Sequence, residues 1–370
     1  MISKLILPVF LIPGSYLVSA QVKNTSVPFT KMNEIYEEVK TPYKYGLVLV
    51  PANDSQKIDC PTVYKKGNTW YMSYLLFGGR GYETCLAESK DLLHWKPAGK
   101  LMTHSADTTL WDASQKAGYM ALEDYNWGGS YELNKYNNKY WMSYFGGRTT
   151  GYEQGLLSLG MAYSTRDISN PNEWQRLPKP ILTSTDKDTR WWENKKQFKS
   201  TVIWDKQKTT GHRFVMFYNA NGDSAKNNIK TRWYERIGMC VSDDMIHWKR
   251  LGNEPVVHHP IGITGDPVIQ RIGDVWVMFY FGAFWKDKKG AFNRFACSYD
   301  LVNWTDWTGE DLINSSEPYD KLYAHKSFVV KYDGVVYHFY CAVNKKEQRG
   351  IAVATSKDMG KSILHFATNN

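Results

Sequence analysis

Short apolar runs bounded by turn residues recur along the chain, and one polar and apolar pattern marks each recurrence. The pattern is Ser-x-Asp, a few apolar residues and then Trp, at residues 89–95, 242–248 and 298–304. An expanded copy begins at Ser164 and a truncated copy at Ser356. Apolar and aromatic runs between turn residues are typical of β-strands. The recurrence therefore predicts a repeated β-unit with a structural turn at the Ser and Asp and a packed Trp.

An aromatic strand precedes each copy. These strands read WYMSY, YWMSY, FVMFY, WVMFY and VYHFY and end at Tyr74, Tyr144, Tyr218, Tyr280 and Tyr340. Another apolar strand stands before each one, often across a turn such as KKGN or RIGD, where Gly, Asn and Asp allow tight hairpins. Four-stranded units that repeat roughly every 40 to 50 residues indicate propeller blades. We predict an all-β, five-bladed β-propeller with four-stranded antiparallel blades around a central channel.

The N-terminus differs from the rest of the chain. It has one Lys and an apolar run, followed by Ser19 and Ala20, which is the form of a cleaved secretory signal. We predict a signal peptide at 1–20, an extension at 21–42 and a single domain at 43–370, in a secreted or periplasmic protein. No internal segment approaches the roughly 20 apolar residues that cross a bilayer, so we expect no membrane insertion after signal cleavage.

The composition of the chain limits the kinds of binding partner that we expect. Aromatic residues make up 15% of the chain, which suits aromatic staples between repeats or a carbohydrate-binding surface. The net charge is +9 without a basic cluster, so an acidic polysaccharide is a more natural partner than nucleic acid for an exported protein. The five cysteines fall in apolar runs without metal-ligand spacing, which predicts buried free thiols and no structural zinc.

Charged residues stand at equivalent places before three of the aromatic strands. Asp59, Asp266 and His325 precede the last Tyr of the following aromatic strand by 15, 14 and 15 residues. The same count reaches Gly129 in the second unit, and strand matching places residues 198–199 there in the third. In a propeller these positions converge on one channel mouth, where titratable groups can perform acid–base chemistry. Each Asp also precedes Pro or Cys-Pro and could be a turn residue.

The five repeats and the segments DCP, GDPV and AHKS resemble the five-bladed propeller glycoside hydrolases of families 43 and 117. Family 130 phosphorylases are a more distant relative. By this resemblance Asp59 is the base and His325 or a Glu the proton donor, with Asp266 orienting the pair. The family 117 version, with a fifth-blade His, fits better than the Asp and Glu of family 43. The resemblance implies an exo-acting, inverting hydrolase of oligosaccharides from a complex, possibly acidic, polysaccharide. It requires no cofactor, and a channel-bound metal ion stays open.

Other residues are weaker candidates. Glu132, near the second-unit position, is an alternative catalytic acid. Arg80 and Arg148 stand in two similar segments and either bind an anion or pair with Glu83 and Glu153. The full set of predicted substrate-binding residues is Arg80, Arg148, Trp127, Trp191, Trp192, Glu193, Lys199 and Trp285.

Two other functions stay open at this point. A glycoside phosphorylase would need a basic phosphate pocket, which Arg80, Arg148 and Lys199 could supply. A propeller lectin would bind glycan through the loop aromatic residues without turnover.

Overall fold

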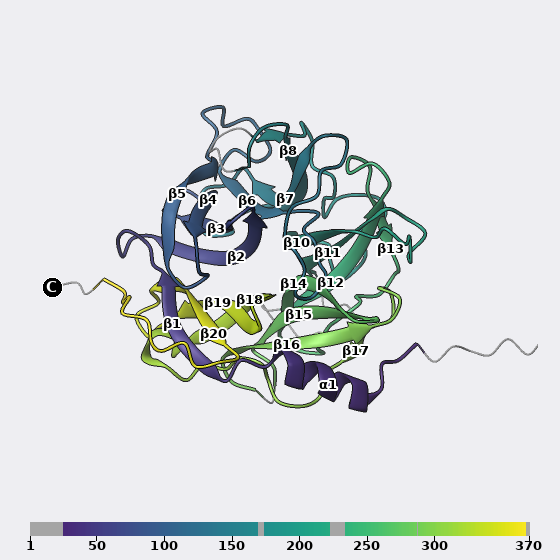
Figure 1. The fold of residues 1–370 in the computed structure, drawn as a ribbon. Helices are drawn as coiled ribbons and strands as arrows, with labels where there is room; N and C mark the ends of the chain where they lie inside the picture. The colour runs from purple at the N-terminus through teal and green to yellow at the C-terminus, as the bar shows by residue number, and fades with distance from the viewer. Residues whose placement is uncertain (1–24, 169–173, 223–233, 287, 368–370) are drawn as a thin grey trace, which may run out of the picture.

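The computed structural model describes residues 25–168, 174–222, 234–286 and 288–367. Within these residues the regular structure is β, apart from helix α1 (Phe29–Val39) and one 3₁₀ turn (Pro318–Asp320). The sheets are arranged around a common centre, with β2, β10, β14 and β18 close to it (Figure 1). The predicted signal peptide lies outside the described residues. Among the described helices, none is long and apolar enough to cross a membrane.

The first two sheets are four-stranded and antiparallel. The first consists of β2 (Lys57–Lys66), β3 (Thr69–Phe77), β4 (Tyr82–Ser89) and β5 (Trp95–Met102). The second consists of β6 (Gln115–Met120), β7 (Tyr140–Gly147), β8 (Ser158–Ser164) and β9 (Gln175–Arg176). In each sheet the strands follow one another in chain order, as the hairpin pattern of the sequence predicts.

The third sheet has eight strands in two antiparallel groups. The first group is β10 (Lys196–Trp204), β11 (Phe214–Asn221), β12 (Glu235–Ser242) and β13 (Lys249–Leu251). The second is β14 (Ile263–Ile272), β15 (Val275–Ala283), β16 (Ala291–Ser298) and β17 (Thr305–Asp306). A single parallel residue pair, Glu235 with Ile263, joins the groups. The described strands therefore form four sheets, where the repeat pattern predicts five separate ones.

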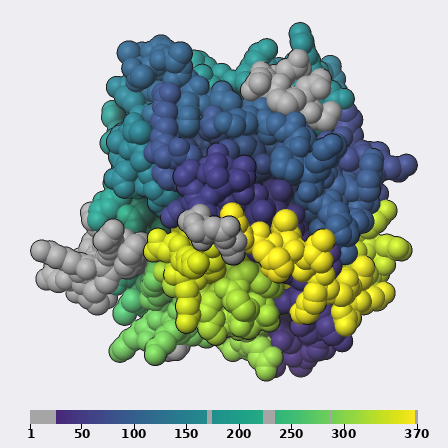
Figure 2. Space-filling view, turned by 90° about the vertical axis from the view of Figure 1, so that its left-hand side faces the viewer, coloured from purple at the N-terminus to yellow at the C-terminus, as the bar shows by residue number. Residues whose placement is uncertain are grey.

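The last sheet joins the two ends of the chain. It consists of β18 (Tyr323–Tyr332), β19 (Val335–Val343), β20 (Arg349–Thr355) and β1 (Tyr43–Leu49). The segment after β20 runs along β1, where the Ser362 N–H donates to the Tyr45 carbonyl at 2.8 Å. These N-terminal and C-terminal segments lie side by side on the surface (Figure 2). The outer strand of this sheet thus comes from the other end of the chain, which holds the two ends together.

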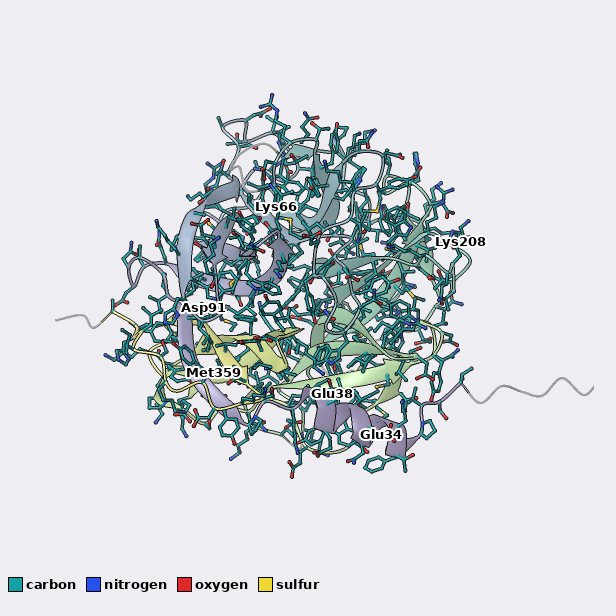
Figure 3. All side chains as sticks on the ribbon, viewed as in Figure 1. Glu34, Glu38, Lys66, Asp91, Lys208 and Met359 are labelled. Carbon is teal, nitrogen blue, oxygen red and sulfur yellow. The ribbon has the colours of Figure 1, made fainter. Side chains whose placement is uncertain are left out.

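Helix α1 packs against the sheets. Its residues Phe29 and Tyr36 stack near the Trp307 ring, with centroid distances of 5.2 and 5.3 Å. Glu38 lies between the helix and the sheets (Figure 3), where its carboxylate accepts a hydrogen bond from Trp127 Nε1 at 2.7 Å. The predicted N-terminal extension is therefore part of the packed structure from the helix onward.

The Ser-x-Asp motif forms a hydrogen-bonded turn. Ser89 Oγ accepts from the backbone N–H groups of Asp91 and Leu92, at 3.2 and 3.0 Å. Asp91 Oδ1 accepts from the His94 N–H at 2.8 Å, and Trp95 Nε1 donates to the Leu92 carbonyl at 2.9 Å. Corresponding bonds recur in both halves of the eight-stranded sheet. The motif recurs because each unit needs this turn, and it has a structural role.

The connection between β6 and β7 corrects the expected place of the second inner strand. The residue count reaches Gly129, but the inner strand is β6, which ends at Met120. The long connection that follows bonds through its backbone to β2, β10 and β14. Its Tyr131 hydroxyl accepts from the Lys331 N–H of β18 at 2.8 Å. This segment, which contains the predicted site residues Trp127 and Glu132, ties the other inner strands together at the ends remote from Asp59.

Candidate active site

The inner strands β2, β14 and β18 share a bulge near their start. One residue in each bulge has a left-handed backbone: Cys60 at φ 49°, Asp266 at 57° and Lys326 at 63°. Such a conformation costs a residue with a side chain of the order of 1–3 kcal/mol, and it clusters at functional sites. Bulges also redirect side chains next to active sites. A bulge with one strained, left-handed residue therefore occurs at three places around one end of the inner strands.

The bulges also correct the predicted register. Asp59 pairs with Leu75 and His325 with Cys341, whereas the corresponding partner of Phe281 is Gly265. Asp59 and His325 are thus equivalent. Asp266 is one residue further along, level with Cys60 and Lys326, which explains why its count to the aromatic strand was 14 rather than 15.

A cavity of about 220 Å³ opens at this end of the inner strands. Its charged lining residues are Glu153, Glu235, Asp266, Lys199, Lys326 and Arg349, with His325 beside them. Its apolar lining includes one packed cluster, Ile263, Phe281, Ala283 and Ala291 with Tyr323, and further aromatic side chains such as Phe145 and Phe198. The cavity thus brings together three of the sequence-predicted residues, Asp266, His325 and Lys199.

Asp59 lies behind the cavity wall and is fully buried. Its Oδ2 accepts from Lys326 Nζ at 3.0 Å and from Arg349 Nη1 at 3.1 Å, and its Oδ1 accepts from the Cys60 N–H at 3.0 Å. Burial alone would raise the pKa of Asp59, but Lys326 and Arg349 outweigh it and hold that pKa well below its usual range. Asp59, the predicted base, is therefore a carboxylate whose Oδ2 already accepts from two cations. Its place behind the cavity wall indicates that its role is to position Lys326 and Arg349.

His325 lines the cavity as a neutral side chain. Burial lowers the pKa of His325 to about 3, and Asp59 offsets this only in part. Its Nδ1 lies 3.2 Å from the Cys341 carbonyl, which fits a ring that donates from Nδ1. Because the imidazolium is scarcely populated at neutral pH, His325 is poorly suited to the predicted role of proton donor.

Asp59, His325 and Cys341 also bring one potential ligand atom each to within 4.8 Å of one another. The group does not fit a metal ion well, because Lys326 and Arg349 already donate to the Asp59 carboxylate and their charges oppose a cation. These charges therefore disfavour a metal ion at Asp59, His325 and Cys341.

Two glutamates that the sequence did not single out as catalytic face the cavity together. Burial, with Glu153 and Asp266 nearby, raises the pKa of Glu235 to about 8, although a 2.7 Å hydrogen bond from Asn219 opposes the rise. Burial also raises the pKa of Glu153, against the effect of Lys326. Carboxyl groups with displaced pKa values in one cleft are a mark of acid–base sites.

Glu153 is held in place by its surroundings. It stands on the β7–β8 connection with a left-handed backbone at φ 50°. Lys196 Nζ donates to the Glu153 carbonyl at 2.6 Å, and the neighbouring Tyr152 hydroxyl accepts from Arg349 at 2.8 Å. Arg349 thus connects the segment of Glu153 to the buried Asp59.

A sequence signal for Glu235 exists in the repeat. Glu235 stands seven residues before Ser242, the first residue of its Ser-x-Asp motif. The same count from Ser89, Ser298 and Ser356 reaches Tyr82, Ala291 and Arg349, which also line the cavity, whereas from Ser164 it reaches Leu157, which is not among the described lining residues. The start of the third strand is therefore a site position in four of the five units.

The other predicted acids lie elsewhere. Glu132 is exposed and its Oε1 accepts from the Gly67 N–H at 3.3 Å, away from the cavity. Glu193 is fully buried and pairs with Arg190 and Arg250, each at 2.7 Å. These positions argue against the predicted catalytic acid at Glu132 and against substrate contact by Glu193.

The predicted arginines do not line the cavity. Arg80 donates to the carbonyls of Ser105 and Ala113, and Arg148 to those of Thr109 and Leu110. Glu83 pairs with Lys100 instead of Arg80. Neither arginine is therefore placed to bind an anion at this site.

The predicted tryptophans contact other parts of the fold. Trp192 is fully buried, Trp285 stacks on His259 at 4.1 Å, and Trp191 lies under the Arg236 guanidinium at 5.1 Å. Together with Trp127 on Glu38, they belong to packing contacts. Other aromatic residues line the cavity instead, among them Phe284 and Tyr323, whose rings are 5.9 Å apart.

Fold and site together define a class of protein. Sheets around a centre carry a cavity with two carboxyl groups of raised pKa, and glycoside hydrolysis needs one group to protonate the leaving oxygen and a second to activate water or attack carbon. The arrangement fits an enzyme that hydrolyses glycosidic bonds.

Solved structures agree with this class. One, named as a complex of BT0996 and RGII, is 53% identical, covers 93% of this chain and 99% of its own, and has a TM-score of 0.89. Another, named a glycoside hydrolase, is 52% identical with the same coverage and TM-score. This protein belongs to the glycoside hydrolases.

More distant structures show the fold alone. A thermostable family-43 glycoside hydrolase is 15% identical with a TM-score of 0.59, over 86% of this chain and 99% of its own. These relationships confirm the predicted resemblance to propeller glycoside hydrolases. Neither a protein-family model nor a curated protein matches the chain.

Proposed function

We propose that the protein is an exo-acting glycoside hydrolase that removes single terminal sugars from oligosaccharides of a complex, acidic polysaccharide. The name of the 53% identical structure includes RGII, so we propose RGII oligosaccharides as substrates. The cavity of about 220 Å³ is smaller than the roughly 300–1,000 Å³ of pockets for drug-sized ligands. This size favours one sugar residue in the cavity over an extended oligosaccharide.

The observation that carries the proposal is the pair Glu153 and Glu235 in one cavity. Because the pKa of Glu235 is about 8, its carboxyl group is protonated at neutral pH and can donate a proton to the leaving oxygen. Glu153 lies near Lys326 and Arg349, whose charges favour its carboxylate. Glu153 then activates water or attacks the anomeric carbon. Asp59 accepts hydrogen bonds from Lys326 and Arg349 and so holds these two side chains in place at the cavity.

Inversion is the stereochemical outcome that the resemblance to families 43 and 117 implies, and we retain it as part of the proposal. Proton NMR of the first sugar released distinguishes the outcomes. Initial appearance of the inverted anomer supports the proposal, and the retained anomer would identify Glu153 as a nucleophile.

We also propose a five-bladed arrangement, in which the two antiparallel groups of the eight-stranded sheet are separate blades. One residue pair joins them, whereas each group has the strand order of the other sheets. Export to the periplasm or the medium, with cleavage after residue 20, remains part of this proposal, and N-terminal sequencing of the mature protein tests it.

The phosphorylase alternative has less support. A phosphate pocket from Arg80, Arg148 and Lys199 would need all three at the cavity, but only Lys199 lines it. A purely glycan-binding protein would not need two carboxyl groups with raised pKa values. These observations favour hydrolysis over both alternatives.

The direct test is a screen of RGII oligosaccharides and neutral and acidic plant and algal oligosaccharides, with and without phosphate. We expect release of one kind of free monosaccharide, independent of phosphate. Release of a sugar phosphate would establish phosphorolysis, and binding without release across the screen would favour the glycan-binding alternative.

A further inference from the structure

Lys199 is an unusual feature of the cavity. Its side chain is almost fully buried, at 1% exposed, and its Nζ has no hydrogen-bond partner within the described part of the chain. It lines the cavity and lies over the Tyr119 ring at 5.7 Å. A buried ammonium group without acceptors is costly, since its three N–H donors have lost water. An acceptor from a ligand in the cavity would remove this cost.

Asp266, on the neighbouring inner strand, is a loosely satisfied acceptor in the same cavity. Its nearest donors are Asn219 Nδ2 at 3.4 Å, Cys60 Sγ at 3.6 Å and Lys326 Nζ at 3.9 Å. Ordinary N–H···O bonds to oxygen are shorter, at roughly 2.7–3.2 Å. The left-handed backbone at Asp266 holds its side chain in this place. Asn219 adds another acceptor, because its Oδ1 is also buried without a partner among the described residues.

Lys199 offers a donor without a partner among the described residues, and Asp266 and Asn219 offer acceptors with unused capacity. A hydroxyl group of a ligand can satisfy both. A sugar hydroxyl donates and accepts at the same time, so neighbouring hydroxyls can accept from Lys199 and donate to Asp266 or Asn219. The apolar side of the cavity, with Ile263 and Phe281, can take the C–H face of the ring.

The charge balance of the cavity opposes a ligand carboxylate. Lys326 and Arg349 already donate to buried Asp59. The remaining cation of the described lining, Lys199, shares the cavity with Asp266 and the two glutamates. A uronic acid would therefore place its charge among carboxyl groups.

We infer that Lys199 and Asp266 determine sugar specificity, by binding neighbouring free hydroxyls of an uncharged terminal sugar. The inference rests on the proposed function and names the sugar class that this cavity accepts. It does not restrict the rest of the oligosaccharide, which stays acidic in the proposed function.

Isothermal titration calorimetry tests this without turnover. The ligands are arabinose, xylose, galactose and glucose, the singly deoxygenated forms of each, and glucuronic and galacturonic acid. The proteins are wild type, Lys199→Met, Asp266→Asn and Lys195→Met. The last is a matched control, since Lys195 is an exposed lysine of the same segment.

We expect at least one neutral sugar to bind to wild type and to Lys195→Met alike. Lys199→Met should weaken its binding roughly 10- to 150-fold, the usual contribution of a hydrogen bond to a charged group. Asp266→Asn should also weaken it. Removal of the hydroxyl that Lys199 binds should weaken binding to wild type and have little further effect in Lys199→Met.

Thermal unfolding without sugar separates binding from a structural role. Lys199→Met removes a buried unpaired charge, so its Tm should equal or exceed that of wild type. A lower Tm with unchanged sugar binding would overturn the inference, as would tighter binding of a uronic acid than of its neutral counterpart, or no binding by any of the sugars. None of these results depends on hydrolysis, so failure of the inference is distinct from failure of the proposed function.

Discussion

Replacement of Asp59 by Asn separates a positioning role from the role of catalytic base. The carboxylate of Asp59 lies between two cations, Lys326 Nζ at 3.0 Å and Arg349 Nη1 at 3.1 Å, and is fully buried. Loss of one partner of a buried ion pair costs roughly 3–5 kcal/mol, because the other charge stays buried without compensation. Since two cations depend on Asp59, we expect a loss of unfolding free energy in the upper part of that range.

Guanidinium denaturation at pH 7 measures this loss. The control is Asp274→Asn, which removes an exposed pair with Lys31 at 3.9 Å, and such pairs contribute roughly 0–1 kcal/mol. The direction in which the stabilisation by Asp59 changes with pH follows from the lowered pKa of Asp59 in the folded protein. Its stabilisation is complete above the unfolded pKa of 3.8 and is lost as pH falls through the lower folded value. The difference between wild type and Asp59→Asn should therefore narrow below pH 3.8.

Turnover by the folded variant distinguishes the two roles. Asp59→Asn should lower kcat because Lys326 and Arg349 are displaced. The pH profile of the variant should still show the ionisations of Glu153 and Glu235. Formate or azide should not restore activity to Asp59→Ala, because residue 59 does not line the cavity. Wild-type stability in Asp59→Asn together with rescue of Asp59→Ala by formate would refute this reasoning and restore Asp59 as the base.

Three further substitutions test residues outside the cavity. Glu193→Gln leaves Arg190 and Arg250 without their buried partner, so denaturation should show a loss of roughly 3–5 kcal/mol, with kcat per folded molecule unchanged. Glu132→Gln should leave kcat and KM as in wild type in steady-state assays, and a large loss of kcat would restore it as a catalytic acid. Tyr131→Phe removes a buried acceptor for a backbone N–H and should lower the unfolding free energy by about 1–3 kcal/mol, measured by the same denaturation.

The repeated units are predictable from the sequence because their determinants are local. The Ser-x-Asp turn needs only residues that are neighbours in the chain, such as Ser89, Asp91 and Trp95. Its copies therefore mark the units reliably even where their spacing varies. The second unit is the exception, because the 19 residues between β6 and β7 replace the short hairpin on which the residue count depends.

The active site was only partly predictable because its residues come from three structural contexts. Asp266, Lys199 and His325 stand on first strands, where the comparison of repeats finds them. Glu235 begins a third strand, and Glu153 stands on a loop with a left-handed backbone.

The role of Asp59 depends on partners remote in the chain. Lys326 and Arg349 approach it across 267 and 290 residues. Sequence comparison identifies an unusual acid at the start of β2. Only the packing shows that two cations donate to it and that it does not line the cavity.

The rate of Glu235→Gln across pH tests the central claim most directly. Glutamine keeps the hydrogen-bonding shape of the protonated carboxyl group but cannot donate its proton to a leaving oxygen. We expect wild-type kcat/KM on an RGII oligosaccharide to fall as pH rises through about 8, the pKa of Glu235. Glu235→Gln should lose roughly 10²–10⁴-fold in kcat and lack that alkaline decline, with its fold intact. Wild-type turnover by Glu235→Gln, with the same alkaline decline, would contradict the assignment of Glu235 as the proton donor.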